Sequence, residues 1–331
     1  MVKSSIPTPQ KLRELGKVVF IRVGALPFIL VVILVTFGVW NPAFLSLVNM
    51  VSASRAATYL IMVTLAQMMV LLSAGLDLSV GGSITLISMV SASTMVSLQA
   101  YPGVDVLVGS LVGIGIGTLI GALNGFSIAF FRISPFVVTF ATGSMAHGMA
   151  LIVSDGGVPV FGLPAYFMST LGAGKVLGIP VPVLVTILLI GVVYLILSWT
   201  RFGRGIYAMG GSRQAAGIMG IPLRRNTFLV YVIAGLLVGI AGVMLTARIG
   251  SGEPTIGLEM PLLSITAAVM GGVSLFGGEG KLYGAILGAI ALTLLRVGMD
   301  LAMIGSFVQM AVMGGVLIMV TALDGYRRRL V

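Results

Sequence analysis

The residues that could carry out chemistry are few. The chain contains no cysteine and one histidine, His147, which excludes thiol chemistry, disulfides and metal clusters held by cysteines or by several histidines. The string G-E-G-K at residues 278–281 looks like a phosphate-binding loop. A Walker A motif, however, needs a glycine five residues before Gly280 and a serine or threonine after the lysine. Those positions hold Leu275 and Leu282, and we expect this glycine-rich stretch to form a tight turn between two apolar runs. The sequence therefore predicts no nucleotide site, no catalytic residues, no metal site and no cofactor.

Asp77 is the ionisable side chain with the strongest claim to a transport role. It lies at the edge of two apolar runs, and a charge at membrane depth is costly and usually functional. Two interpretations stay open: Asp77 lies at a gate or on a translocation path, or it caps the following helix, with Ser79 and Ser83 as further acceptors. For His147, which lies among apolar and small residues, we expect a packed, hydrogen-bonded interior position.

Other charged and small residues are expected to be structural. Arg296 and Asp300 are four residues apart and can pair on one helical face. A stripe of glycines repeats at every fourth residue and predicts close packing against a neighbouring helix. These glycines are Gly109, Gly113, Gly117, Gly121 and Gly125.

The composition requires membrane-spanning helices to position these residues. A mean hydropathy of +1.16 with 8% charged residues leaves too little polar surface for a soluble domain of 331 residues, and apolar runs of this length are typical of bilayer spans. The 46 glycines indicate close helix packing. We predict an all-α polytopic membrane protein with about ten transmembrane helices, each about 20 residues long. The runs lie at 24–40, 57–74, 81–98, 106–130, 136–153, 181–199, 228–247, 261–275, 282–298 and 304–322.

Basic residues predict the orientation. Most of the 19 lysines and arginines lie before the first run, between two central runs, or at the chain end, and such clusters mark the cytoplasmic side. Both termini are then cytoplasmic, and residues 1–331 form a single permease domain. Its cytoplasmic parts are the N-terminal segment 1–23, the loop 200–227 and the tail 323–331. The same bias explains the net charge of +10 without nucleic acid. The first run is expected to be an uncleaved span, not a signal peptide.

The cytoplasmic loop 200–227 contains a predicted short helix. Ser212 follows Gly210 and Gly211 and is a suitable N-cap for a helix over Arg213–Met219, which Gly220 ends. A helix of this kind does no chemistry alone. It can dock into a cleft on another protein and transmit a rigid-body movement.

The loop resembles the energy-coupling segment of ribose-type ABC importer permeases, in the family that handles monosaccharides and branched-chain amino acids. The family pattern is G-R-x-x-Y-A-x-G-G-N-x-x-A-A followed by G-I. This chain carries it at Gly203, Arg204, Tyr207, Ala208, Gly210, Gly211, Ala215, Ala216, Gly220 and Ile221. Ser212 stands where asparagine is common and Gln214 where glutamate is common, which keeps a capping side chain but removes a negative charge. The resemblance implies that this segment, with Arg213, contacts an ATP-hydrolysing subunit.

Three further stretches resemble the same family. Residues 75–81 read G-L-D-L-S-V-G and match its G-x-D-L-S-V-G segment, and residues 121–125 resemble its fourth span. Residues 270–280 resemble its G-G-T-S-L-x-G-G-x-G stretch, with Val273 in place of threonine. The candidate residues for a translocation path or gate are Asp77, Ser79, Asn124 and Ser274.

The resemblance implies the permease subunit of an ABC importer in the bacterial plasma (inner) membrane. It would move a small polar solute, a monosaccharide or sugar derivative, into the cytoplasm by alternating access. Its implied partners are cytoplasmic ATPase subunits, an extracytoplasmic solute-binding protein, and a second permease subunit, identical or different. The alternatives are an ABC permease for an amino acid, nucleoside or signalling molecule, an ion-coupled secondary transporter, and a scaffold without transport activity. Secondary transporters usually need intramembrane ionisable groups, of which this chain has few.

Overall fold

The computed structural model describes residues 26–328 and is built almost entirely of helices. Seven helices have the length and apolar composition of membrane spans: α3, α4, α5, α6, α8, α11 and α13. Three shorter apolar stretches, in α2, α12 and α14, coincide with the remaining predicted runs. The all-α polytopic fold is therefore confirmed, while the count of ten spans stays a prediction.

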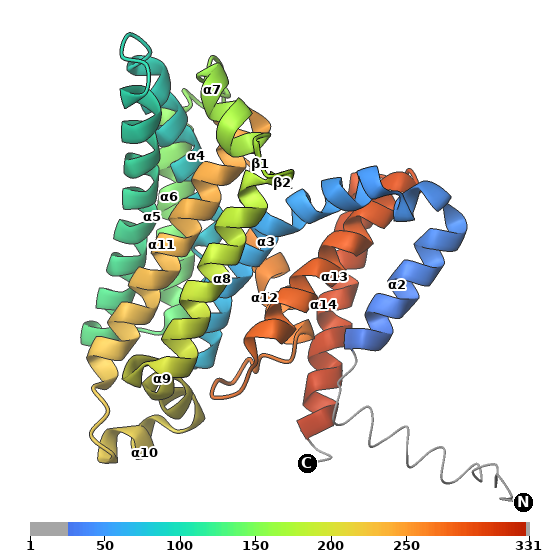
Figure 1. Ribbon diagram of the computed structural model, residues 1–331. Coiled ribbons are helices and arrows are strands. Elements are labelled where there is room, and N and C mark those ends of the chain that lie inside the picture. Colours follow the sequence, from blue (N-terminus) through green and yellow to red (C-terminus); the bar gives the residue numbers. More distant parts are fainter. Residues whose placement is uncertain (1–25, 329–331) are drawn as a thin grey trace, which may run out of the picture.

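The helices follow one another with short connections (Figure 1). In the first half their bounds are α2 Leu26–Trp40, η1 Pro42–Leu45, α3 Leu47–Leu72, α4 Val80–Ser97, α5 Val104–Phe131 and α6 Pro135–Val153. Next come α7 Ala165–Phe167, η2 Met168–Gly172, α8 Val181–Trp199, α9 Arg201–Gly211 and α10 Arg213–Ile218. The last helices are α11 Leu223–Ile249, α12 Met260–Met270, α13 Leu282–Leu301 and α14 Ser306–Arg328.

Helix α3 is the centre of the packing. Its second half, from Ala57 to Leu72, is continuously buried, and it contacts α8, α11, α12 and α13. In Figure 1, α4, α5, α6 and α11 stand on one side of it, and α2, α13 and α14 on the other. A helix that is apolar all round is expected only where other helices surround it, and α3 has that position.

The glycine stripe of α5 packs against neighbouring helices, as the sequence predicts: Gly109 faces α4, and Gly117, Gly121 and Gly125 face α11. A Cβ atom on Gly121 would lie 2.2 Å from the carbonyl oxygen of Tyr231, and one on Gly117 would lie 2.6 Å from that of Gly235. Gly239 faces the backbone of Ile114 in the same way. The two backbones thus approach too closely for any larger side chain, which is the packing that small residues permit between membrane helices.

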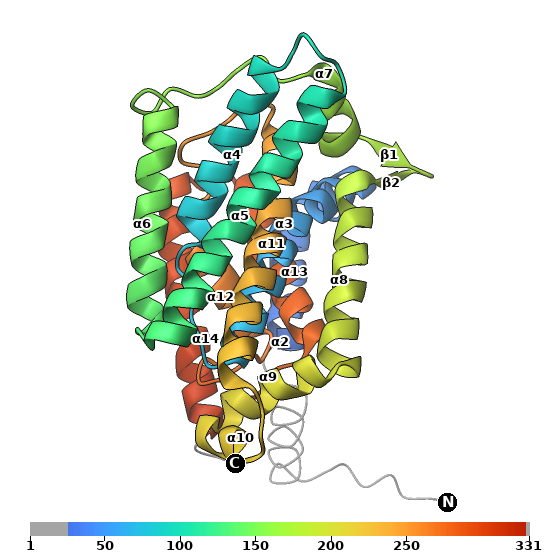
Figure 2. The ribbon, with the colours of Figure 1, turned by 90° about the vertical axis from the view of Figure 1, so that its left-hand side faces the viewer.

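The two ends of the molecule differ. At one end lie α9, α10 and the C-terminal end of α14 (Figure 2). At the other lie α7 and a two-stranded antiparallel hairpin of β1 (Lys175–Val176) and β2 (Ile179–Pro180), which pairs Lys175 with Pro180. This hairpin belongs to the segment 154–180, and a bridge between Val160 and Gly252 joins the segment to the stretch after α11.

Candidate functional site: a docking helix and the polar contacts behind it

The predicted cap of the short helix is present in α10. The Ser212 hydroxyl accepts a hydrogen bond from the Ala215 backbone N–H at 3.2 Å, and Ser212 itself has extended backbone angles, as an N-cap requires. Gly220 follows the helix with a φ of +76°, a conformation that glycine adopts without strain. The prediction of a helix started by Ser212 and ended at Gly220 is confirmed.

The segment before it is also helical, which the sequence analysis did not predict. Helix α9 begins after Thr200, whose hydroxyl accepts a hydrogen bond from the Gly203 N–H at 2.9 Å. Thr200 is a residue type that indicates the start of a helix. The four glycines of α9, at positions 203, 205, 210 and 211, indicate the opposite, because glycine disfavours helix interiors. Three of them approach other residues closely: a Cβ on Gly203 would lie 2.2 Å from the Ile196 carbonyl oxygen.

Helix α10 protrudes from the molecule. The residues Arg213, Gln214 and Ala215 are exposed, and so are Ile218 and Met219 at its end. A single helical turn with exposed apolar side chains suits contact with another protein. Ala216 differs, because it is buried against the rest of the chain. Of the predicted contact residues in this turn, Ala216 therefore packs inward and Ala215 faces out.

Helix α9 is tied to the interior at two points. The Tyr207 hydroxyl donates a hydrogen bond to the Gly280 carbonyl oxygen at 3.1 Å, and burial raises the pKa of the Tyr207 phenol, which keeps the donor protonated. Gly210 lies against the end of α3, where its Cβ would come within 1.9 Å of the Leu72 carbonyl oxygen. That same carbonyl accepts a hydrogen bond from the Gly278 N–H at 3.0 Å. Movement of α9 would therefore reach both α3 and the segment 271–281.

A buried polar cluster lies beyond the end of α3. Asp77 accepts hydrogen bonds from the backbone N–H and the hydroxyl of Ser79, at 2.9 and 2.6 Å. The Asn124 amide of α5 donates to the Ser79 hydroxyl at 2.9 Å, and Thr142 of α6 donates to the Asn124 carbonyl oxygen at 2.6 Å. Asp77 is 3% exposed and Asn124 0%. Three of the four predicted path residues are thus in one hydrogen-bonded chain.

Neighbouring helices hold the connection 73–79 in place. Tyr231 of α11 donates to the Leu76 carbonyl oxygen at 3.1 Å, and the Leu78 N–H donates to the Thr139 hydroxyl of α6 at 3.1 Å. Asp77 does not occupy the N-cap position of α4; Ser79 does, so Asp77 holds the turn that precedes the helix. Sequence reasoning missed Thr139, Thr142 and Tyr231, because a polar side chain in an apolar helix carries no local signal of its distant partner.

Ser274, the fourth predicted path residue, lies in the other irregular segment. Its N–H donates to the Glu279 carbonyl oxygen at 2.8 Å, and its hydroxyl accepts from the Phe276 N–H at 3.0 Å. Gly277 and Gly278 have φ values of +90° and +74°. These contacts form the tight glycine-rich turn that the sequence predicts here, and the turn meets α9 through Gly278 and Gly280.

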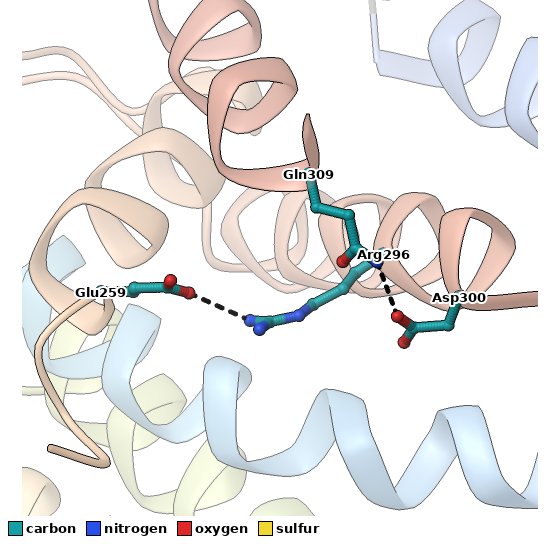
Figure 3. Close-up of polar contacts among 4 residues, drawn as sticks. All are labelled: Glu259, Arg296, Asp300 and Gln309. Carbon is teal, nitrogen blue, oxygen red and sulfur yellow. Dashed lines mark hydrogen bonds and ion pairs between the residues drawn. The ribbon is translucent and has the colours of Figure 1, made fainter. Parts of the chain in front are cut away.

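The expected pairing of Arg296 with Asp300 is wrong. Arg296 pairs with Glu259, at the start of α12, at 3.4 Å, while Asp300 accepts a hydrogen bond from Gln309 of α14 at 2.8 Å (Figure 3). Tertiary packing brings these partners closer than the residue one turn away. His147 is half-buried, and its Nδ1 is buried without a hydrogen-bond partner in the described part of the chain. The side chain is therefore packed as expected, but the expected hydrogen bond is not made at Nδ1.

A bundle of long apolar helices defines a polytopic membrane protein. The chain belongs to the family described as branched-chain amino acid transport system / permease component, whose model matches residues 49–321.

Several relatives are similar over most of their length. The ribose import permease protein of Bacillus subtilis (strain 168) is 36% identical, over 90% of each chain. The D-allose transport system permease protein of Escherichia coli (strain K12) is 32% identical, also over 90% of each. The L-arabinose ABC transporter permease protein of Azospirillum brasilense is 33% identical, over 91% of this chain and 86% of the relative. No solved structure matches the chain.

Proposed function

We propose that this protein is the permease subunit of an ABC importer that moves a monosaccharide or sugar derivative across the bacterial inner membrane. The names of the similar permeases support a sugar, since ribose, allose and arabinose are all monosaccharides. The observation that carries the proposal is the protruding α10, capped by Ser212 and connected through α9 to the end of the central helix α3. Two such permeases, identical or different, would surround the path.

In this mechanism α10 docks on a cytoplasmic ATPase subunit, and a solute-binding protein delivers the sugar at the opposite end. Closure of the ATPases pushes α10, and α9 moves with it because Ser212 alone separates the two helices. The contacts of Tyr207 and Gly210 pass this movement to the segment 271–281 and to α3. The connection 73–79 follows α3 directly, so the polar chain from Asp77 to Thr142 is where the path would change between its inward and outward forms.

An Ala215→Glu substitution tests the docking role. Ala215 is exposed, so the new carboxylate enters water and spares the fold. We expect ATP-driven sugar uptake to be lost while membrane insertion is unchanged, and we expect the ATPase to co-purify less well. Ala100→Glu, at an exposed alanine in the turn between α4 and α5, is the matched control. Normal uptake by the Ala215 variant would refute the coupling role, and uptake driven by an ion gradient without ATP would favour a secondary transporter instead.

A further inference from the structure

Two arginines converge on one tyrosine at the end of the molecule opposite α10. Arg55 and Tyr59 are one turn apart on α3 and therefore share a face. Arg248, in the last turn of α11, places its guanidinium carbon 5.1 Å from the centroid of the Tyr59 ring. Both positive charges act on the Tyr59 phenol. This arrangement is a cation–π contact with a second cation beside it.

No carboxylate of the described residues balances these charges. The one ion pair between residues 26 and 328 joins Arg296 to Glu259. Glu253 lies five residues after Arg248, but its carboxylate accepts a hydrogen bond from the Ser251 hydroxyl at 2.7 Å. Arg55 is half-buried and Arg248 is exposed, and neither has a carboxylate counter-charge within ion-pair distance among the described residues.

The cluster also contains buried donors without acceptors. Tyr59 is 2% exposed, and beyond the neighbouring Thr58 side chain its hydroxyl has no hydrogen-bond partner among the described residues. The Nε–H of the half-buried Arg55 is likewise buried and unpartnered. Buried donors are rarely left unpaired, and the Arg55 Nε–H finds no acceptor in the part of the chain that the structure describes.

We propose that Arg55, Tyr59 and Arg248 form a binding site for the anionic group of a small molecule, a phosphate or a carboxylate. Guanidinium groups pair with both through parallel N–H donors, and a phenol O–H adds a further donor. Arg248 is exposed and its guanidinium lies over the Tyr59 ring, so an anion from solvent can pair with it. The group can come from a soluble solute, such as a sugar acid, or from a lipid headgroup.

The site can be tested on the full-length protein in nanodiscs of zwitterionic lipid, with inorganic phosphate and gluconate as probes in isothermal titration calorimetry. We expect saturable binding. Arg55→Gln and Arg248→Gln should each weaken it about tenfold, the usual effect of losing one charge-assisted hydrogen bond. Tyr59→Phe should weaken it about fivefold while keeping the ring.

Lys175→Gln, at an exposed cation of the same end, is the matched control and should bind as the unmodified chain does. Thermal melting of each variant shows whether it is folded, and Arg55→Lys, which keeps the charge, should retain part of the affinity.

Repeating the titration with phosphatidylglycerol in the discs separates the two sources. If the lipid competes, the affinity for phosphate and gluconate should be about tenfold lower, which identifies a headgroup as the occupant. An unchanged affinity for these probes identifies a soluble anion. Absence of saturable binding to either probe in zwitterionic discs would overturn the site, as would equal binding by folded variants of Arg55 and Arg248. Either failure leaves the role of α10 untouched, because that role is measured by uptake at the other end of the molecule.

Discussion

The hydroxyl of Tyr207 on α9 donates a hydrogen bond to the carbonyl oxygen of Gly280, 73 residues further along the chain. The bond joins the helix before α10 to the glycine-rich turn that leads into α13. A docking helix needs such a connection, since a force applied to a loosely attached helix would be lost in the loop.

Tyr207→Phe tests this connection. The ring still packs, so we expect stability to fall by only ~1 kcal/mol, the net contribution of one neutral hydrogen bond. Sugar uptake per ATP hydrolysed by the reconstituted complex should fall more than stability does, because the turn no longer follows α9 closely. Uptake and hydrolysis that stay in the original ratio would contradict a coupling role for Tyr207. Tyr283→Phe serves as the control, because Tyr283 is an exposed tyrosine in the first turn of α13.

Asn124→Leu breaks the buried polar chain at its middle. Leucine has a similar size but can neither donate to Ser79 nor accept from Thr142, so two buried groups lose a partner. We expect a loss of ~1–3 kcal/mol in stability, measured by thermal melting in detergent, together with impaired uptake. Thr142→Val should cost less, because Asn124 keeps its bond to Ser79. If the Asn124→Leu variant melts at the original temperature, the hydrogen bonds of Asn124 do not stabilise the connection 73–79.

The sequence predicts local features of this protein well and distant contacts poorly. The Ser212 cap and the turn at Gly277 depend on a few neighbouring residues, and both were predictable. The bond from Asn124 to Ser79 spans 45 residues, and only the family resemblance suggested the two as candidates. Arg296 shows the opposite case. A partner one turn away was the natural expectation, but the fold brings Glu259 closer, and that position depends on how α12 enters the bundle.

Single cysteines can test the predicted orientation, because the chain has none of its own. Lys175 and Ser212 are both exposed. Lys175 belongs to β1 and Ser212 caps α10, and these two elements lie at opposite ends of the molecule (Figure 2). With the N-terminus in the cytoplasm, Lys175→Cys should react with a membrane-impermeant maleimide once the outer membrane is opened, while Ser212→Cys should react only after the inner membrane is permeabilised. The reverse pattern would overturn the orientation derived from the basic clusters. Equal labelling of both sites before permeabilisation would show that they lie on the same side.

Gly121→Ala tests whether α5 and α11 must touch. The added methyl would lie 2.2 Å from the Tyr231 carbonyl oxygen, and since that oxygen belongs to a helix backbone, no side-chain rotation can relieve the clash. The helices must separate, which costs about 1–3 kcal/mol or more and also shifts Tyr231 away from Leu76. Gly115→Ala is a matched control on the same helix, because no atom lies within 4 Å of its Cβ position. We expect that change to be neutral or to stabilise by up to about 1 kcal/mol through helix propensity. Melting temperatures that fall equally for both variants would show that glycine flexibility, and not close contact, explains the stripe.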